Sequence, residues 1–101
     1  MFTINITTKV DPKITSEWLL WQKEVHIPAL METGCFSSYR FHQLLEQDES
    51  DGKIFVLQLM AASKESHQNF INEYEMTLKN QVIVKWGEKS FEFRSLLQNI
   101  D

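Results

Sequence analysis

Residues 54–62 read Ile-Phe-Val-Leu-Gln-Leu-Met-Ala-Ala and are apolar at odd and even positions alike. Because successive side chains of a strand point to opposite faces, this pattern predicts a strand in the middle of a sheet that is covered on both faces. Residues 35–46 precede it and contain several aromatics but no Gly or Pro, and the hydrophilic segment 47–52 ends in Asp-Gly. The two strands are therefore predicted to form a hairpin.

Two outer segments, residues 2–10 and 90–98, alternate apolar with polar side chains. This is the period of a strand, so each segment predicts one.

The first helix is predicted between the Asp11-Pro12 break and Gly34, because proline suits a first helical turn and glycine a helix end. On a wheel with about 100° per residue, one stripe of about 60° is predicted to be buried. This stripe consists of Ile14, Trp18, Trp21 and Val25. His26 lies about 100° from the stripe, at its boundary, and Pro28 is predicted to disturb the helix nearby.

A second helix is predicted from the N-cap Ser63 through Trp86 to Gly87, with one inward arc. The arc consists of His67, Phe70, Ile71, Tyr74 and Leu78.

The predicted order of elements is βαββαβ, in a single domain over residues 1–101. Right-handed crossovers convert this order into an α+β, ferredoxin-like fold, an antiparallel four-stranded sheet in the order 4-1-3-2 with two helices on one face. The helices cover one face, whereas residues 54–62 are apolar on both. We therefore expect a homodimer, sheet against sheet, in the form of a dimeric α/β barrel that buries about 800 Å² per chain. The alternative is a monomer whose exposed side chains shield one another.

Composition excludes several classes of partner. The chain carries 10 Lys and Arg against 14 Asp and Glu, a net charge of -4, which argues against nucleic acid or an anionic membrane as the main partner. Its single Cys cannot form an internal disulfide. No apolar run approaches the roughly 18 residues of a membrane span, and the first residues do not resemble a signal peptide. These features predict a cytoplasmic protein.

Five segments carry a resemblance to a known family. They are residues 10–18, 23–28 with its His-Ile-Pro, 33–36, 73–74 and 85–87. With them the chain resembles, over nearly its whole length, a family of small bacterial proteins of unknown function. That family is similar to the dimeric α/β-barrel group, which includes monooxygenases of polyketide quinols and haem, muconolactone-type isomerases and non-catalytic stress proteins. The resemblance implies the ferredoxin-like fold and the dimer, and no particular activity.

His26 and His42 are the candidate catalytic residues, because histidine transfers protons near neutral pH. Arg40 or Arg94 would stabilise an oxyanion. The alternative for His26 is a structural histidine that bonds to the backbone. Cys35 is predicted to be a small buried hydrophobe, since residues 35 and 42 of a regular strand point to opposite faces and cannot pair.

A set of polar residues shares one parity within each strand and would line a cavity if that parity faces the barrel. The set consists of Asn5, Arg40, His42, Gln58, Glu92 and Arg94. Alternatively, its members pair across strands or face solvent. Trp18 and other aromatics would line a flat hydrophobic pocket or simply form core.

The sequence has no Gly-rich phosphate loop, and its three histidines lie in separate predicted elements without metal-ligand spacing. We therefore expect no cofactor and no metal. The first functional hypothesis is a small-molecule-binding or non-catalytic module, with a small hydrophobic ligand. The alternative is a cofactor-independent monooxygenase or isomerase acting on a small aromatic substrate, and a third hypothesis is a purely structural interaction module. The sequence leaves open whether the protein is an enzyme.

Overall fold

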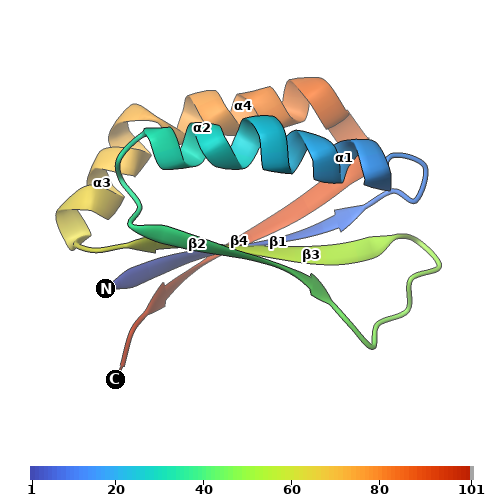
Figure 1. The fold of residues 1–101 in the computed structure, drawn as a ribbon, viewed down its shortest axis with the longest axis horizontal. Coiled ribbons are helices and arrows are strands. Elements are labelled where there is room, and N and C mark those ends of the chain that lie inside the picture. The colour runs from blue at the N-terminus through green and yellow to red at the C-terminus, as the bar shows by residue number, and fades with distance from the viewer. Residues whose placement is uncertain (101) are drawn as a thin grey trace.

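The computed structural model describes residues 1–100, which form a four-stranded antiparallel sheet with all helices on one face (Figure 1). The strands are β1 (Phe2–Val10), β2 (Ser38–Leu44), β3 (Lys53–Ala61) and β4 (Ser90–Gln98). They lie in the order β2-β3-β1-β4, which is the predicted order counted from the other edge. β2 is shorter than predicted, because Cys35 and Phe36 lie in the connection before it, where both are buried.

The first helical segment contains a change of helix type. It consists of α1 (Thr15–Trp21), the π-helical turn η1 (Gln22–His26) and α2 (Ile27–Glu32). Gly34 follows with a φ of 74°, a left-handed conformation typical of a helix end.

The second helical segment is divided. It consists of α3 (Lys64–Glu73), α4 (Glu75–Trp86) and the short 3-10 helix η2 (Gly87–Lys89). The Ser63 hydroxyl accepts a hydrogen bond from the Ser66 N–H at 3.1 Å, as expected of an N-cap. An uninterrupted helix is wrong at Tyr74, whose φ of -127° breaks it. Ile71 and Tyr74 are consequently exposed, and the buried positions are Phe70, Leu78, Val82 and Trp86.

The core lies between the helices and the sheet. One cluster of buried side chains surrounds Leu59 and Phe70, and a second surrounds Trp18 and Phe55. On β3 the predicted alternation is visible, since Leu59 is fully buried and its neighbour Met60 is only half-buried on the other face. The turn before β3 lies so close to β1 that a side chain at Gly52 would collide with the Val10 carbonyl oxygen.

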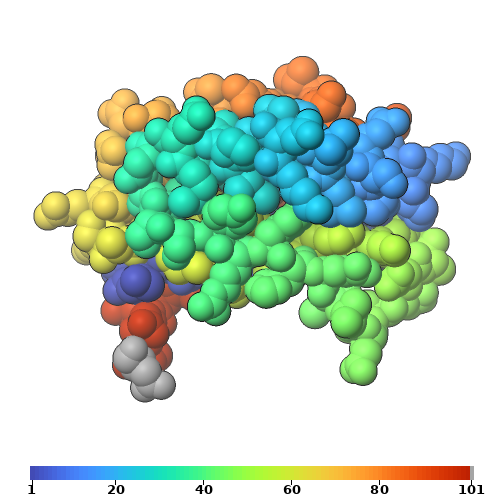
Figure 2. All heavy atoms as spheres, in the orientation of Figure 1, coloured from blue at the N-terminus to red at the C-terminus, as the bar shows by residue number. Residues whose placement is uncertain are grey.

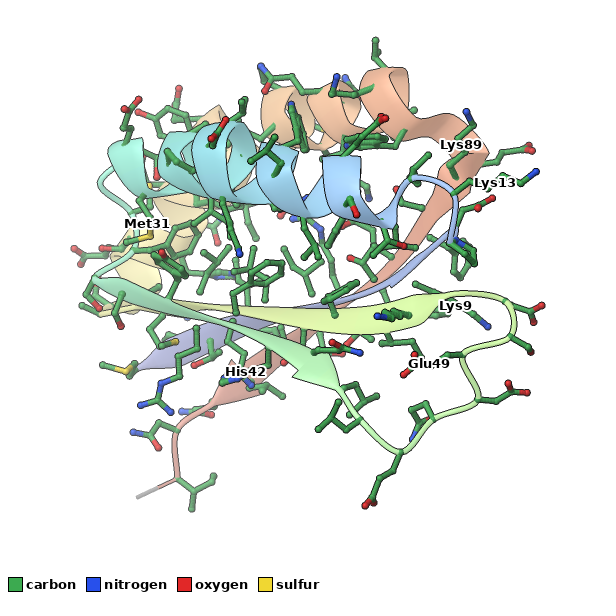
Figure 3. The ribbon with its side chains drawn as sticks, turned by 45° about the vertical axis from the view of Figure 1, so that its right-hand side comes forward. Lys9, Lys13, Met31, His42, Glu49 and Lys89 are labelled. Atoms are coloured by element: carbon green, nitrogen blue, oxygen red, sulfur yellow. The ribbon has the colours of Figure 1, made fainter. Side chains whose placement is uncertain are left out.

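The face of the sheet away from the helices is open. Figure 2 shows that this side is hollowed between the C-terminal end of the chain and the loop that joins β2 to β3. In Figure 3 His42 points into this open side, away from the helices. The fold thus has a covered face with a dry core and an open face whose strands have no second layer in the single chain.

Candidate functional site

A small chamber lies between the helices and the sheet. Its walls come from β1, β2, β3 and β4 below and from α1, η1 and α4 above. The lining consists of Ile6, Thr8, Trp18, Gln22, His26, Phe41, Phe55, Leu57, Val82 and Glu92. About 10 Å³ is open to the centre of a water-sized sphere, roughly the space of one water molecule.

The π-helical turn brings Gln22 and His26 into this chamber. Pro28 has no N–H to donate to the carbonyl of Glu24, and its ring would crowd that carbonyl, so a regular α-helical turn is unfavourable here. The chain instead takes a wider turn, in which the Ile27 N–H bonds to the Gln22 carbonyl, five residues back. Turns of this kind occur frequently at functional sites.

The wider turn absorbs about one residue and changes which side chains face inward. In a regular helix Leu30 would lie about 120° from Trp18, whereas with one residue fewer between them the angle falls to about 20°. Leu30 and Trp18 are both buried, which agrees with the smaller angle of about 20°. The predicted position of Val25 in the buried stripe is therefore wrong: Val25 is 48% exposed, and His26 is only 4% exposed.

His26 is held in a dry aromatic environment. Its ring stacks on Trp21 with a centroid separation of 5.0 Å and an interplanar angle of 12°. Burial, and to a smaller extent the positive charge of Arg94, together lower the pKa of His26 from 6.5 to about 4. His26 is therefore neutral at pH 7, and its Nδ1 atom is buried without a hydrogen-bond partner among residues 1–100.

Two indole nitrogens in the same region also lack partners. Trp18 packs on Phe55 with a centroid separation of 5.3 Å and on Phe41 at 6.0 Å. Its Nε1 is buried and unbonded within the described part of the chain, as is that of Trp86. An unpaired buried donor costs about 1–3 kcal/mol, so these atoms are poised to bind an acceptor.

A charged cluster closes one side of the chamber. The Arg94 guanidinium lies 3.7 Å from a Glu75 carboxylate oxygen and 3.6 Å from one of Glu92. Glu92 lines the chamber directly. The Nε and Nη1 atoms of Arg94 are buried and make no hydrogen bond to residues 1–100. The cluster places one cation and two carboxylates at the base of the helices, largely shielded from water.

The polar set predicted to share one cavity is divided between the two faces. Asn5, Arg40, His42 and Gln58 lie on the open face, where Gln58 donates a hydrogen bond to the Asn5 side-chain oxygen at 3.1 Å. Glu92 and Arg94 pair in register with Thr8 and Ile6 and so lie on the covered face. Arg40 and His42 are exposed. Convergence of His42 with Arg94 is therefore excluded by the register. Of the predicted site residues, Trp18, His26 and Glu92 line the chamber, and Arg94 lies beside Glu92.

Sequence reasoning missed Thr8, Gln22, Glu75 and Trp86. The four-residue spacing of Trp18, Gln22 and His26 was a usable signal, because it marks one side of a helix whose turns are slightly widened. Cys35 is buried, as predicted, and the Asn69 side-chain amide donates a hydrogen bond to its sulfur at 3.5 Å. Among residues 1–100 no cluster of His, Cys, Asp and Glu could hold a metal ion, and no helix is long and apolar enough to cross a membrane.

Comparison with protein families gives one match, to the Domain of unknown function (DUF4286), over residues 1–100. The chain belongs to the DUF4286 family. This confirms the predicted resemblance to a family of unknown function. No curated protein matches the DUF4286 chain.

Solved structures similar to the DUF4286 chain share its fold. A dimeric ferredoxin-like protein from an uncultured marine organism aligns with a TM-score of 0.73 and 15% identity, covering 99% of this chain and 95% of the other. HapK from Hahella chejuensis aligns at 0.72 and 11% identity, covering 99% and 93%. An "ethyl tert-butyl ether d (ethd)" family protein from Bacillus halodurans aligns at 0.70 and 9% identity, covering 99% and 100%. At such low identity, the likeness confirms the ferredoxin-like fold alone.

Proposed function

We propose that this protein binds a small molecule in the chamber beneath the π-helical turn and acts as a homodimer. The observation that carries the proposal is a pair of buried nitrogen atoms at that chamber, on Trp18 and His26, which have no hydrogen-bond partner in the described part of the chain. Folding leaves such atoms unpaired at a cost of about 1–3 kcal/mol each, which a ligand with a hydrogen-bonding group would recover.

The walls indicate the kind of ligand. Phe41, Phe55 and Leu57 make one side of the chamber apolar and largely aromatic, with the two Phe rings tilted by 35° to each other. The opposite side presents the polar groups of Trp18 and His26. A flat, mostly apolar molecule with one hydroxyl or carbonyl group satisfies both sides.

The chamber in its closed form is too small for such a molecule, so binding requires a movement of its wall. The half-buried ring of Trp21 stacks on His26 and so lies directly behind that wall.

The proposed dimer rests on β4, whose charged side chains face the helices and whose aromatic side chains face the open side. Glu92 and Arg94 lie under the helices, whereas Phe91 and Phe93 stand on the open face, 61% and 63% exposed. Their rings pack edge-on at 4.9 Å. An exposed aromatic pair on a hollowed sheet face is typical of an interface. The similar marine structure described as dimeric supports the same assembly.

Titration followed by NMR tests the ligand site. Indole N–H signals report separately on the protein's three Trp side chains, and Trp18→Phe assigns the relevant one. Phenol, benzamide and benzoate are added in turn. We expect the Trp18 indole signal to shift with at least one neutral compound and to saturate. If all three compounds leave this signal unmoved up to their solubility limits, the proposed site is wrong.

A second candidate function is catalysis without a cofactor, as an isomerase or monooxygenase of a small aromatic substrate. A specific observation favours it: His26 is buried and neutral at pH 7, and its Nδ1 has no hydrogen-bond partner among residues 1–100, so this nitrogen is free to accept a proton. Its lowered pKa makes it a weaker base than a free imidazole. Arg94, whose positive charge acts on His26, would stabilise negative charge. Deuterium exchange at the methyl group of acetophenone in D₂O tests this role. Acceleration by the wild type that His26→Asn abolishes supports catalysis, and equal rates with and without protein exclude it for this substrate class.

A further inference from the structure

A groove on the outside of the helices lies against the wall of the chamber. It has a volume of about 630 Å³ and runs between the first helical segment and α4. Its lining consists of Trp21, Val25, Thr77, Asn80, Gln81, Val84 and Lys85. This size falls in the range of pockets that hold small ligands.

The groove and the chamber share one thin wall. Trp21 lines the groove, and the His26 ring stacked on it lines the chamber. Two consecutive residues of α4 also lie on opposite sides of this wall. Gln81 lines the groove, and Val82 lines the chamber. Two stacked rings, 5.0 Å apart between centroids, therefore separate an open groove from buried atoms that lack partners.

We propose that the groove and the chamber are two halves of one ligand site, with the Trp21 ring as the movable wall between them. The ligand is an elongated flat molecule of two or more rings. Its hydrogen-bonding end reaches His26 and Trp18, and its apolar body lies against Val25 and Val84. The ligand part of this inference rests on the proposed function, whereas the movable wall can be tested without any ligand.

Trp21 is the wall best suited to move. It is half-buried, like Phe41, but it stands where the helix changes from α to π geometry. Phe55 and Leu57 are almost fully buried on β3, which is bonded to a strand on either side, so the sheet cannot open there. The remaining alternative is Phe41, which is half-buried on the edge strand β2. The groove lies outside Trp21 and does not include Phe41.

Chemical labelling of the histidines tests the wall. Diethyl pyrocarbonate reacts with neutral imidazole, and mass spectrometry resolves the modified His26, His42 and His67. In the wild type we expect His26 to react far more slowly than the exposed His42. Trp21→Ala is expected to raise the rate at His26 about tenfold through easier local opening, with no change at His42.

Several variants keep this test decisive. Leu20→Ala is the matched control, because Leu20 is an exposed neighbour that lines neither the groove nor the chamber. Trp21→Leu is measured as well. If loss of the near-ultraviolet circular dichroism shows that Trp21→Ala is unfolded, Trp21→Leu replaces it in the test. An unchanged rate at His26 in the folded Trp21 variants overturns the movable wall, as does a larger increase in Phe41→Ala.

Two probes test the two-part site. In the wild type 4-phenylphenol is expected to bind about tenfold more tightly than phenol, because its second ring leaves water and enters the groove. Val84→Asp should weaken binding of 4-phenylphenol about fivefold and leave phenol unchanged. Equal affinities of the two probes, or an equal loss for both, would overturn the two-part site while leaving the chamber itself intact. Absence of binding by both would instead refute the proposed function.

Discussion

The two faces of the sheet differ in where their polar and apolar side chains lie. On the covered face, side chains are mostly apolar, and buried polar ones gather around one chamber, where several nitrogens have no hydrogen-bond partner within residues 1–100. On the open face, polar residues occupy the centre, where Asn5 and Gln58 bond to each other, and aromatic residues stand on the edge strand β4. Unpaired buried polarity is therefore a feature of the covered face, and unpaired apolar surface a feature of the open one.

This contrast separates two roles. A buried donor without a partner points to a small ligand, because only something small and polar can reach it. An exposed aromatic pair points to a large, flat partner, for which a second copy of the chain is our proposal. The following predictions test the contrast.

Adjacent residues of β3 give the largest expected difference between the faces. Leu59→Ala should lower the free energy of unfolding by about 3 kcal/mol, because it opens a cavity in the core at a fully buried position. Met60→Ala should cost less, and its cost should rise with protein concentration, since only a dimer would bury that side chain. Urea unfolding at two protein concentrations measures both. Concentration-independent losses of equal size would contradict the contrast.

The pH dependence of stability tests the buried polarity of the covered face. The pKa of His26 is lowered from 6.5 in the unfolded chain to about 4 in the fold. The unfolded state therefore binds the extra proton between these values, and stability contributed by neutral His26 is complete above pH 6.5 and lost as pH falls toward 4. The full loss amounts to about 3 kcal/mol.

Urea unfolding between pH 4 and pH 7 measures this slope. His26→Asn should flatten it, whereas His42→Asn, on the open face, should leave it unchanged. A slope that survives the first substitution would assign the proton uptake to another group.

The dimer proposal is tested on the open face. Phe93→Glu places a charge in the proposed interface and should weaken dimerisation by about 2 kcal/mol, roughly thirtyfold in the dissociation constant. Ile83→Glu is the matched control on the exposed side of α4, where a charge should have no such effect. Sedimentation equilibrium measures both. A wild type that is monomeric at micromolar concentration would refute the assembly.

The smallest expected effect concerns the polar centre of the open face. Gln58→Ala removes the hydrogen bond of 3.1 Å to Asn5 and should cost about 1 kcal/mol. A double-mutant cycle with Asn5→Ala isolates the interaction between the two side chains. A coupling energy indistinguishable from zero would show that water satisfies these groups equally well.

The sequence was sufficient for the strands and insufficient for the site. Alternation in residues 2–10 and 90–98 identified β1 and β4 because a strand always advances by two residues per repeat. Alternation does not say which side faces the helices, so Glu92 and Arg94 were grouped with His42 although the register places them on opposite faces.

The helical wheel failed for a related reason. It assumes a constant angle per residue, and the π-helical turn breaks that assumption at Gln22–His26. Pro28 was recognised as a disturbance, but the sequence did not specify how the chain would respond. Burial of His26 instead of Val25 follows from that response.

Because of the π-helical turn, the number of residues in the first helical segment decides whether the His26 side chain reaches the chamber. Removal of one residue such as Lys23 would take away the residue that the π-helical turn accommodates, and both flanking segments would still present Trp18 and Leu30 to the core. His26 would then no longer lie in a π-helical turn next to Pro28, and its side chain would leave the chamber. A change of a single codon triplet could therefore erase the site and spare the fold, so relatives with equally good cores can differ in whether they possess it.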